Sequence, residues 1–380
     1  MVQATFEFSP LAAASATATP AAARNSHRPA HPAGADAMDS VGFEIGWDHA
    51  HHCVTPPLGH LHQPNPVHQG WLAGRAAFGA RSLAATAAVR QWLALRLLAW
   101  QQGEAFEGVQ VNPSFLSRID AVACPVSRQL MTLSANLPSD ATVTRLNPAA
   151  AYAAGNLVVL SQRVAAADYA PADAAAGLNA DEQARLAVLR SFATPLPHAQ
   201  AALLALRVLP PNRVRVINPV QALQVTLTLQ FLQAGYARRL LGLAVLMPSS
   251  ETRQAFQIFM HTLLARRLSA GQGATPADLR RAMEDSWADV LVNRRWQRLA
   301  SRLTAADCEL LLQRASQRSL VVGGSRWVSR ECATEGWALE AGLAPAARQT
   351  LPQPVDQAGV GSAVRRPGMA RSLGSQKLAS

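Results

Sequence analysis

The sequence predicts a mainly α-helical protein with a small β-hairpin-plus-helix (ββα-like) module near its middle and an α-helical C-terminal half. Apolar residues recur every three or four positions through most of the second half, which is the period of an amphipathic helix. Two β-branched or apolar runs, at residues 141–146 and 156–160, are instead typical of strands. Hydrophobic residues make up 49% of the 380 residues, enough to bury a sizeable core.

The two ends of the chain differ in composition from the middle. Residues 1–40 are rich in Ala, Thr, Ser and Pro, and residues 346–380 are rich in Gly, Ser, Pro and Arg. Neither end has enough periodic apolar residues to form a core, so we expect both to be disordered. Between them we expect an N-terminal domain over residues 41–178 and a basic α-helical domain over residues 179–345.

The first domain begins with a segment that we predict to be irregular. Residues 41–70 contain four prolines, which interrupt helices and central strands. A helix is then predicted from Ser82 to Gly103, because its apolar residues follow the three-to-four spacing. Next come an extended piece at residues 109–111, a short turn or helix at 113–119, and the strands 141–146 and 156–160. Ser161 is the predicted N-cap of a short helix that ends near Ala167.

The second domain is a series of helices with recognisable starts. Asn179 with Glu182 resembles a capping box, Thr275 is followed by proline, and Thr304 is followed by an acid three residues later. One helix starts at Pro197, and the others are predicted at residues 219–234, 236–246, 250–268, 276–292, 294–303 and 304–315. A closing strand pair is expected at residues 319–328.

One segment has a more specific pattern. Over residues 124–168 it combines a Cys-Pro-Val-Ser turn, a strand that contains an arginine, a loop with a tyrosine, a Gly-Asn pair and an apolar strand. This segment resembles the HNH-type endonucleases of the ββα-metal fold. The matching residues are Cys124, Val126, Ser127, Arg145, Asn147, Tyr152, Gly155, Asn156 and the strand 157–161.

The resemblance implies a scaffold more than an activity. Such a nuclease needs a general base and a divalent cation. In the family the hairpin strand supplies the base or an acidic metal ligand, and the following helix supplies a further ligand. Here the strand position is held by Thr144, and the helix offers alanines at residues 165–167. A threonine hydroxyl is a poor base near neutral pH and a poor lone ligand for a hard cation. We therefore predict a degenerate, non-catalytic module.

Candidate metal ligands form one group of residues. Asn156 stands where the family uses an asparagine, although its amide can equally tie the loop to the hairpin backbone. His49, His51 and His52 lie in the densest group of histidines and are the other candidates, against the alternative of an exposed loop. No cofactor is expected, and a divalent metal would be needed only if the protein were a nuclease. The four cysteines are far apart, so neither a disulfide framework nor a four-cysteine zinc site is predicted.

Arginine dominates the basic residues, with 34 Arg and one Lys in a chain of net charge +11. By position the net charge is −1 for residues 1–178, +8 for residues 179–345 and +4 for residues 346–380. A basic surface attracts phosphate backbones, and an ordinary solvated helix surface is the alternative. The candidate nucleic-acid-binding residues are Arg145, Arg294, Arg295, Arg298 and Arg302, of which Arg294, Arg298 and Arg302 have the spacing of one helix face.

Three hypotheses for the function follow from these patterns. The first is a non-catalytic protein that binds DNA or RNA through its basic helical half, the second a divergent metal-dependent HNH-like endonuclease, and the third a structural module that binds an unknown protein partner. The sequence contains no phosphate-binding glycine loop, dinucleotide fingerprint or long apolar run. We therefore expect no membrane association and a cytoplasmic, bacterial-type protein.

Overall fold

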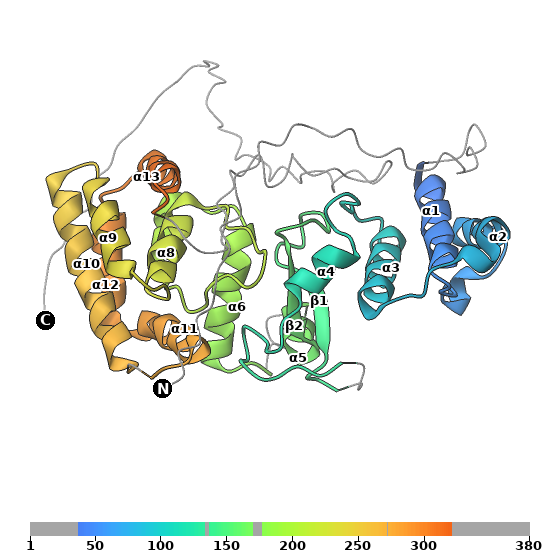
Figure 1. Cartoon of the computed structure of the whole chain (residues 1–380), viewed down its shortest axis with the longest axis horizontal. Coiled ribbons are helices and arrows are strands. Elements are labelled where there is room, and N and C mark those ends of the chain that lie inside the picture. The colour runs from blue at the N-terminus through green and yellow to red at the C-terminus, as the bar shows by residue number, and fades with distance from the viewer. Residues whose placement is uncertain (1–36, 134–136, 170–176, 272, 321–380) are drawn as a thin grey trace, which may run out of the picture. The chain divides into compact units, whose positions relative to one another are not determined.

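The computed structural model describes residues 37–133, 137–169, 177–271 and 273–320 (Figure 1). These residues form helices and one two-stranded antiparallel sheet, which confirms the predicted fold class. Within the described ranges no helix combines the length and apolarity needed to cross a bilayer. Residues 1–36, the tail 346–380 and all but the first two residues of the strand pair expected at 319–328 lie outside the described residues.

The first described elements correct two predictions, disorder up to residue 40 and an irregular segment at residues 41–70, because a helix begins at Ala37. Helix α1 (Ala37–His51) and helix α2 (Pro66–Phe78) pack closely, with the 3-10 turn η1 (Leu58–His60) between them. An added Cβ at Gly46 would lie 1.9 Å from the Val67 oxygen, and one at Gly70 would lie 1.9 Å from the Phe43 oxygen. The two helices touch through backbone atoms at glycines. Their interface therefore lacks the regular row of large apolar side chains by which a helix pair is predicted from sequence.

The helix that we predicted to begin at Ser82 begins later. A 3-10 turn, η2 (Gly79–Arg81), precedes it, and α3 (Ala87–Gln101) starts after Thr86, whose hydroxyl accepts a hydrogen bond from the Val89 amide. Thr86 satisfies an amide at the helix start, which Ser82 is too far away to do. The short helix α4 (Pro113–Ile119) follows as predicted, capped by the Asn112 side chain.

The predicted hairpin and helix are present. Strand β1 (Ala141–Arg145) pairs antiparallel with β2 (Leu157–Ser161), in a register that places Val143 opposite Val159, and α5 (Gln162–Tyr169) follows directly. Figure 1 shows the two strands side by side with α5 labelled at their end. All five residues of β2 are buried, so this strand is covered on both of its faces.

The two faces of β2 belong to different hydrophobic clusters. Leu157 and Val159 pack with α4 residues such as Phe115, whereas Val158 and Leu160 join the large cluster that fills the C-terminal half. This alternation is the two-residue period of a strand. The hairpin is therefore packed between the α4 region and the C-terminal helices.

The C-terminal helices confirm the predicted caps. Asn179 and Glu182 form a capping box, as do Thr304 and Asp307, and the Thr275 hydroxyl caps the helix that starts at Pro276. The helix predicted over 276–292 is wrong, because it ends at Asp285 and a new helix begins after Asp289. The elements are α6 (Ala180–Ala193), α7 (His198–Leu203), α8 (Pro219–Gln230), α9 (Tyr236–Val245), α10 (Ser250–Ser269), α11 (Pro276–Asp285), η3 (Ser286–Ala288), α12 (Val290–Ala300) and α13 (Ala305–Gln317).

Aromatic side chains from three elements fix the centre of this half. Phe259 on α10 lies with its ring centroid 5.7 Å from Trp287 and 5.5 Å from Trp296, and the two tryptophans are 5.9 Å apart. All three are buried, and the Trp296 indole also donates to the Ala202 carbonyl oxygen at 3.0 Å. Such a cluster buries a large apolar area, which fixes which side of α12 faces inward.

Candidate nucleic-acid interface

Arg145, which we predicted to contact nucleic acid, lies inside the hairpin. Its guanidinium donates to both carboxylate oxygens of Glu104, at 2.9 and 3.1 Å, and to the Ala150 carbonyl oxygen at 3.1 Å. It also lies 4.4 Å from the ring centroid of Tyr152, and the residue is only 5% exposed. A guanidinium engaged in this way ties the hairpin to the segment before α4 and presents little surface to a ligand.

Asn156 is likewise engaged by the backbone. Its Oδ1 accepts from the Asn147 amide at 2.8 Å, and its Nδ2 donates to the carbonyl oxygens of Asn147 and Ala151 at 3.0 and 2.9 Å. The side chain is 1% exposed and closes the loop between the two strands. These contacts match the alternative in which the amide ties the loop to the hairpin backbone.

Thr144 and residues 165–167 are the other positions at which the HNH-like resemblance implies a base or metal ligands. Thr144 is buried in β1, and residues 165–167 of α5 present only methyl groups. Neither element places a carboxylate or imidazole at these positions. The hairpin and α5 therefore form a strand–strand–helix unit with a hydroxyl and three alanines at these positions.

Of the three candidate histidines, His49 and His51 lie in α1 and His52 lies in the turn directly after it. His49 is buried and donates from Nδ1 to the Ile45 carbonyl oxygen at 2.8 Å, and burial lowers the pKa of its imidazole. His51 stacks on Phe78 with centroids 4.5 Å apart, and His52 lies edge-on to Trp92 at 6.4 Å. Among the described residues no three His, Cys, Asp or Glu side chains are grouped closely enough to hold a metal ion.

Helix α12 places the other predicted arginines on the surface. Val292, Trp296 and Leu299 are buried, and Arg294 and Arg298, one turn apart on the opposite side, are exposed. One helical turn of four residues separates them by about 6 Å along the axis. The predicted shared face is therefore confirmed for Arg294 and Arg298 but not for Arg302, because the helix ends at Ala300.

The two further arginines of this group differ in position. Arg302 lies just past the helix end, where it is exposed and its Nη1 donates to the Arg298 carbonyl oxygen at 2.6 Å. A cation there complements the negative end of the helix dipole. Arg295 is half-buried. We call Arg294, Arg298 and Arg302 the α12 stripe; none of the three has a salt-bridge partner among the described residues.

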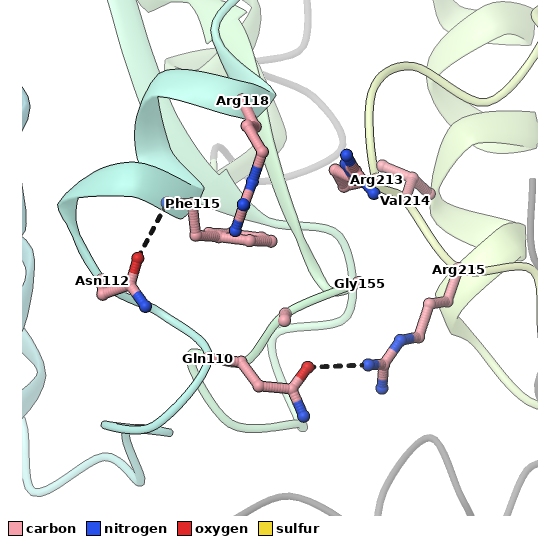
Figure 2. Close-up of a pocket in the computed structure, with 9 residues that line it drawn as sticks. Gln110, Asn112, Phe115, Arg118, Gly155, Arg213, Val214 and Arg215 are labelled. Atoms are coloured by element: carbon pink, nitrogen blue, oxygen red, sulfur yellow. Dashed lines mark hydrogen bonds between the residues drawn. The ribbon is translucent and has the colours of Figure 1, made fainter. Parts of the chain in front are cut away.

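A second group of arginines, which the sequence did not indicate, surrounds a pocket of about 320 Å³ (Figure 2). One wall comes from α4 and the residues before it, another from the Gly155 loop, and the third from residues 213–215. The lining residues are Gln110, Asn112, Phe115, Arg118, Ala154, Gly155, Arg213, Val214 and Arg215.

Three hydrogen bonds attach the third wall to the other two walls of the pocket. The backbone amide of Arg215 donates to the Gly155 carbonyl oxygen at 3.1 Å. The Nη2 of the Arg215 side chain donates to the Gln110 side-chain oxygen at 3.0 Å (Figure 2). Asn212 donates from Nδ2 to the Asp120 carbonyl oxygen at 3.1 Å. The pocket is thus assembled from segments about 100 residues apart, which is why no local motif reveals it.

Helix α11 anchors the same wall from the other side. The buried Glu284 carboxylate accepts from the Leu209 amide at 3.0 Å, and Arg280 donates to the carbonyl oxygens of Leu209 and Pro210 at 2.9 and 3.1 Å. Arg128, from the Cys-Pro-Val-Ser turn, reaches the same carboxylate at 3.3 Å. Burial raises the pKa of Glu284, against the opposing effect of Arg280 and Arg128.

No protein-family model, curated protein or solved structure matches the chain.

Proposed function

We propose that this protein binds nucleic acid through the α12 stripe and does not cleave it. The observation that supports this most directly is the stripe itself. All three arginines are exposed and have no salt-bridge partner among the described residues; Arg294 and Arg298 share a face of α12, and Arg302 lies just past its end. Exposed arginines grouped in this way can contact the phosphates of a nucleic-acid backbone.

The distribution of charge over the chain supports the same proposal. The stripe belongs to residues 179–345, whose net charge is +8. Exposed cations in a region with that excess attract a polyanion over about a Debye length, roughly 8–10 Å at moderate salt. The binding that we propose is therefore electrostatic and weakly dependent on sequence, because phosphate contacts carry no base information.

The proposal that the protein does not cleave is supported by the hairpin. We interpret it as a degenerate HNH-like scaffold whose polar side chains serve the fold. Asn156 holds three backbone groups, Arg145 holds Glu104, and Thr144 and the alanines of α5 stand where the family would hold a base and metal ligands. Hydrolysis of a phosphodiester at neutral pH needs such groups close to the phosphate.

The test is a binding and cleavage experiment on the purified chain with a labelled duplex DNA and a labelled single-stranded RNA. We expect binding that weakens by at least about tenfold as salt rises from about 50 to about 200 mM. We also expect both probes to stay intact after incubation with Mg²⁺ or Mn²⁺.

Either of two results would contradict the proposal. Affinity that is independent of salt would point instead to a protein-partner module. Metal-dependent cleavage that is lost in Asn156→Ala or His52→Ala would show the divergent nuclease that the sequence left open.

A further inference from the structure

The arginine pocket supports a second binding site, whose evidence is independent of the α12 stripe. We infer that this pocket binds a nucleotide through a terminal phosphate, either as a free nucleoside monophosphate or as the phosphorylated end of a strand. The inference depends on three features of the pocket, namely its charge, its size and its remaining polar groups.

The charge of the pocket favours an anion. Three arginines line it, whereas no carboxylate does. Arg118 and Arg213 are exposed and have no salt-bridge partner among the described residues. Two acids lie close to the lining residues. Glu107 is fully buried and accepts from the amides of Gln110 and Ala154 at 2.6 and 3.2 Å, and Asp120 follows α4 and is exposed. Against three arginines, these two charges leave an excess of positive charge at the pocket.

The number of guanidiniums matches a phosphomonoester better than a phosphodiester. A terminal phosphate has about −1.5 to −2 charges near neutral pH and three acceptor oxygens, whereas a diester linkage has one charge. Arginine binds such oxygens in a planar, two-pronged geometry. Arg118 approaches from α4 and Arg213 and Arg215 from the opposite wall, as Figure 2 shows, so an anion between them is contacted from more than one side.

The size and the remaining lining residues favour a ligand larger than phosphate. A volume of about 320 Å³ is roughly ten times the ~30 Å³ that one water occupies in the liquid, and it lies at the lower end of small-ligand pockets. The side-chain nitrogen of Gln110 is a donor of the kind that recognises a base edge, while its oxygen accepts from Arg215 and the Asn112 side chain caps α4. Phe115 adds an apolar wall beside them.

The backbone conformation of Arg213 also supports a role for its side chain in binding. Arg213 has φ of 63°, in the left-handed region that is unfavourable for most residues and that glycine adopts freely. It occupies the tight turn in which the Val214 amide donates to the Pro211 carbonyl oxygen at 3.3 Å. An arginine kept at such a position is consistent with use of its guanidinium.

This conformation makes Arg213→Gly an unusually clean test. The change removes the guanidinium and also relieves the left-handed strain, so the variant should fold at least as well as the natural chain. Arg118→Ala, on the surface of α4, is the second variant. Arg314→Ala, an exposed arginine of α13 outside the pocket, is the control for the loss of one positive charge.

The experiment measures binding of the four common ribonucleoside 5′-monophosphates, their nucleosides and inorganic phosphate by calorimetry. At least one monophosphate is expected to bind more tightly than both its nucleoside and inorganic phosphate. Arg213→Gly and Arg118→Ala should each weaken that binding by about tenfold or more, and Arg314→Ala should leave it unchanged. A single strand with a 5′-phosphate, compared with the same strand ending in a hydroxyl, serves as the second arm.

Binding of a free monophosphate locates the source as a free nucleotide. Binding of only the phosphorylated strand locates it as a strand end. The inference is overturned if neither the monophosphates nor the phosphorylated strand binds better than its unphosphorylated counterpart. It is also overturned if inorganic phosphate binds as tightly as every nucleotide, or if both pocket variants bind as well as the Arg314→Ala control.

Discussion

The hairpin and helix α12 use the same residue type in opposite ways. In the hairpin Arg145 is buried, paired with Glu104 through two hydrogen bonds and stacked near Tyr152. On α12 Arg294 and Arg298 are exposed and have no salt-bridge partner among the described residues. The comparison shows that in an arginine-rich chain the surroundings of each guanidinium, and not its presence, indicate whether it stabilises the fold or meets a ligand.

The largest effect that this contrast predicts is on stability. Arg145→Met should reduce the free energy of unfolding by about 3 kcal/mol, because breaking a buried ion pair leaves its partner uncompensated. Arg298→Met should change it by less than about 0.5 kcal/mol, as is usual for exposed positions. Urea unfolding followed by circular dichroism measures both. Equal losses of unfolding free energy in the two variants would contradict the contrast between the buried and the exposed arginine.

The second effect concerns the amide that closes the hairpin loop. Asn156→Ala should cost about 2 kcal/mol, because it leaves the buried Asn147 amide and two carbonyl oxygens without their partner. The exposed Gln200→Ala on α7 is the control and should be close to neutral. If Asn156→Ala unfolds at the same urea concentration as the control, the amide is free for another role and our interpretation of the hairpin fails.

The sequence predicted the elements whose signals are local. The caps at Asn179 and Thr304, the two strands and the exposed side of α12 all depend on residues within a few positions of one another. The α1–α2 pair was missed because its interface is backbone against backbone at Gly46 and Gly70, and glycine usually signals the absence of a helix.

The pocket could not have been predicted from local patterns. Gln110 and Arg215 are 105 positions apart, and only the folded chain brings them together. The one local sign was the Pro-Pro-Asn sequence before Arg213, which favours a tight turn. That sign predicts a turn and says nothing of what the following arginine faces.

A third, smaller effect is expected at the loop that joins the hairpin to the pocket. Gly155 has φ of 96°, and an added Cβ would lie 2.4 Å from both Cγ and Cδ of Arg215. Gly155→Ala should therefore cost about 1–2 kcal/mol and also displace Arg215 from the pocket wall. Gly59→Ala, where an added Cβ meets no atom within 4 Å, is the control. Thermal unfolding of the two variants measures the difference. Indistinguishable unfolding midpoints for Gly155→Ala and Gly59→Ala would contradict this account of the pocket wall.

The smallest effect is a pH dependence at Glu284, which holds the pocket wall from α11. Because burial raises the pKa of this carboxyl in the folded chain, its contribution to stability is complete below the ordinary glutamate pKa and is lost as pH rises through the raised value. Glu284→Gln removes the titration. The stability of the natural chain relative to this variant should therefore decrease as pH rises above the ordinary value. A relative stability that increases with pH would contradict a raised pKa for Glu284 in the folded chain.

The central claim is that the α12 stripe, and not the overall positive charge, binds nucleic acid. The most direct measurement is the salt dependence of duplex DNA binding by the variant Arg294→Ala, Arg298→Ala, Arg302→Ala. Its control is the variant Arg81→Ala, Arg90→Ala, Arg314→Ala, which removes three exposed arginines elsewhere and has the same net charge.

If the stripe contacts about three phosphates, the logarithmic salt slope of the stripe variant should be shallower by about 2.7 than that of the natural chain. The control variant should keep the natural slope. Identical slopes and affinities for the two variants would contradict the claim, because net charge alone would then account for the binding.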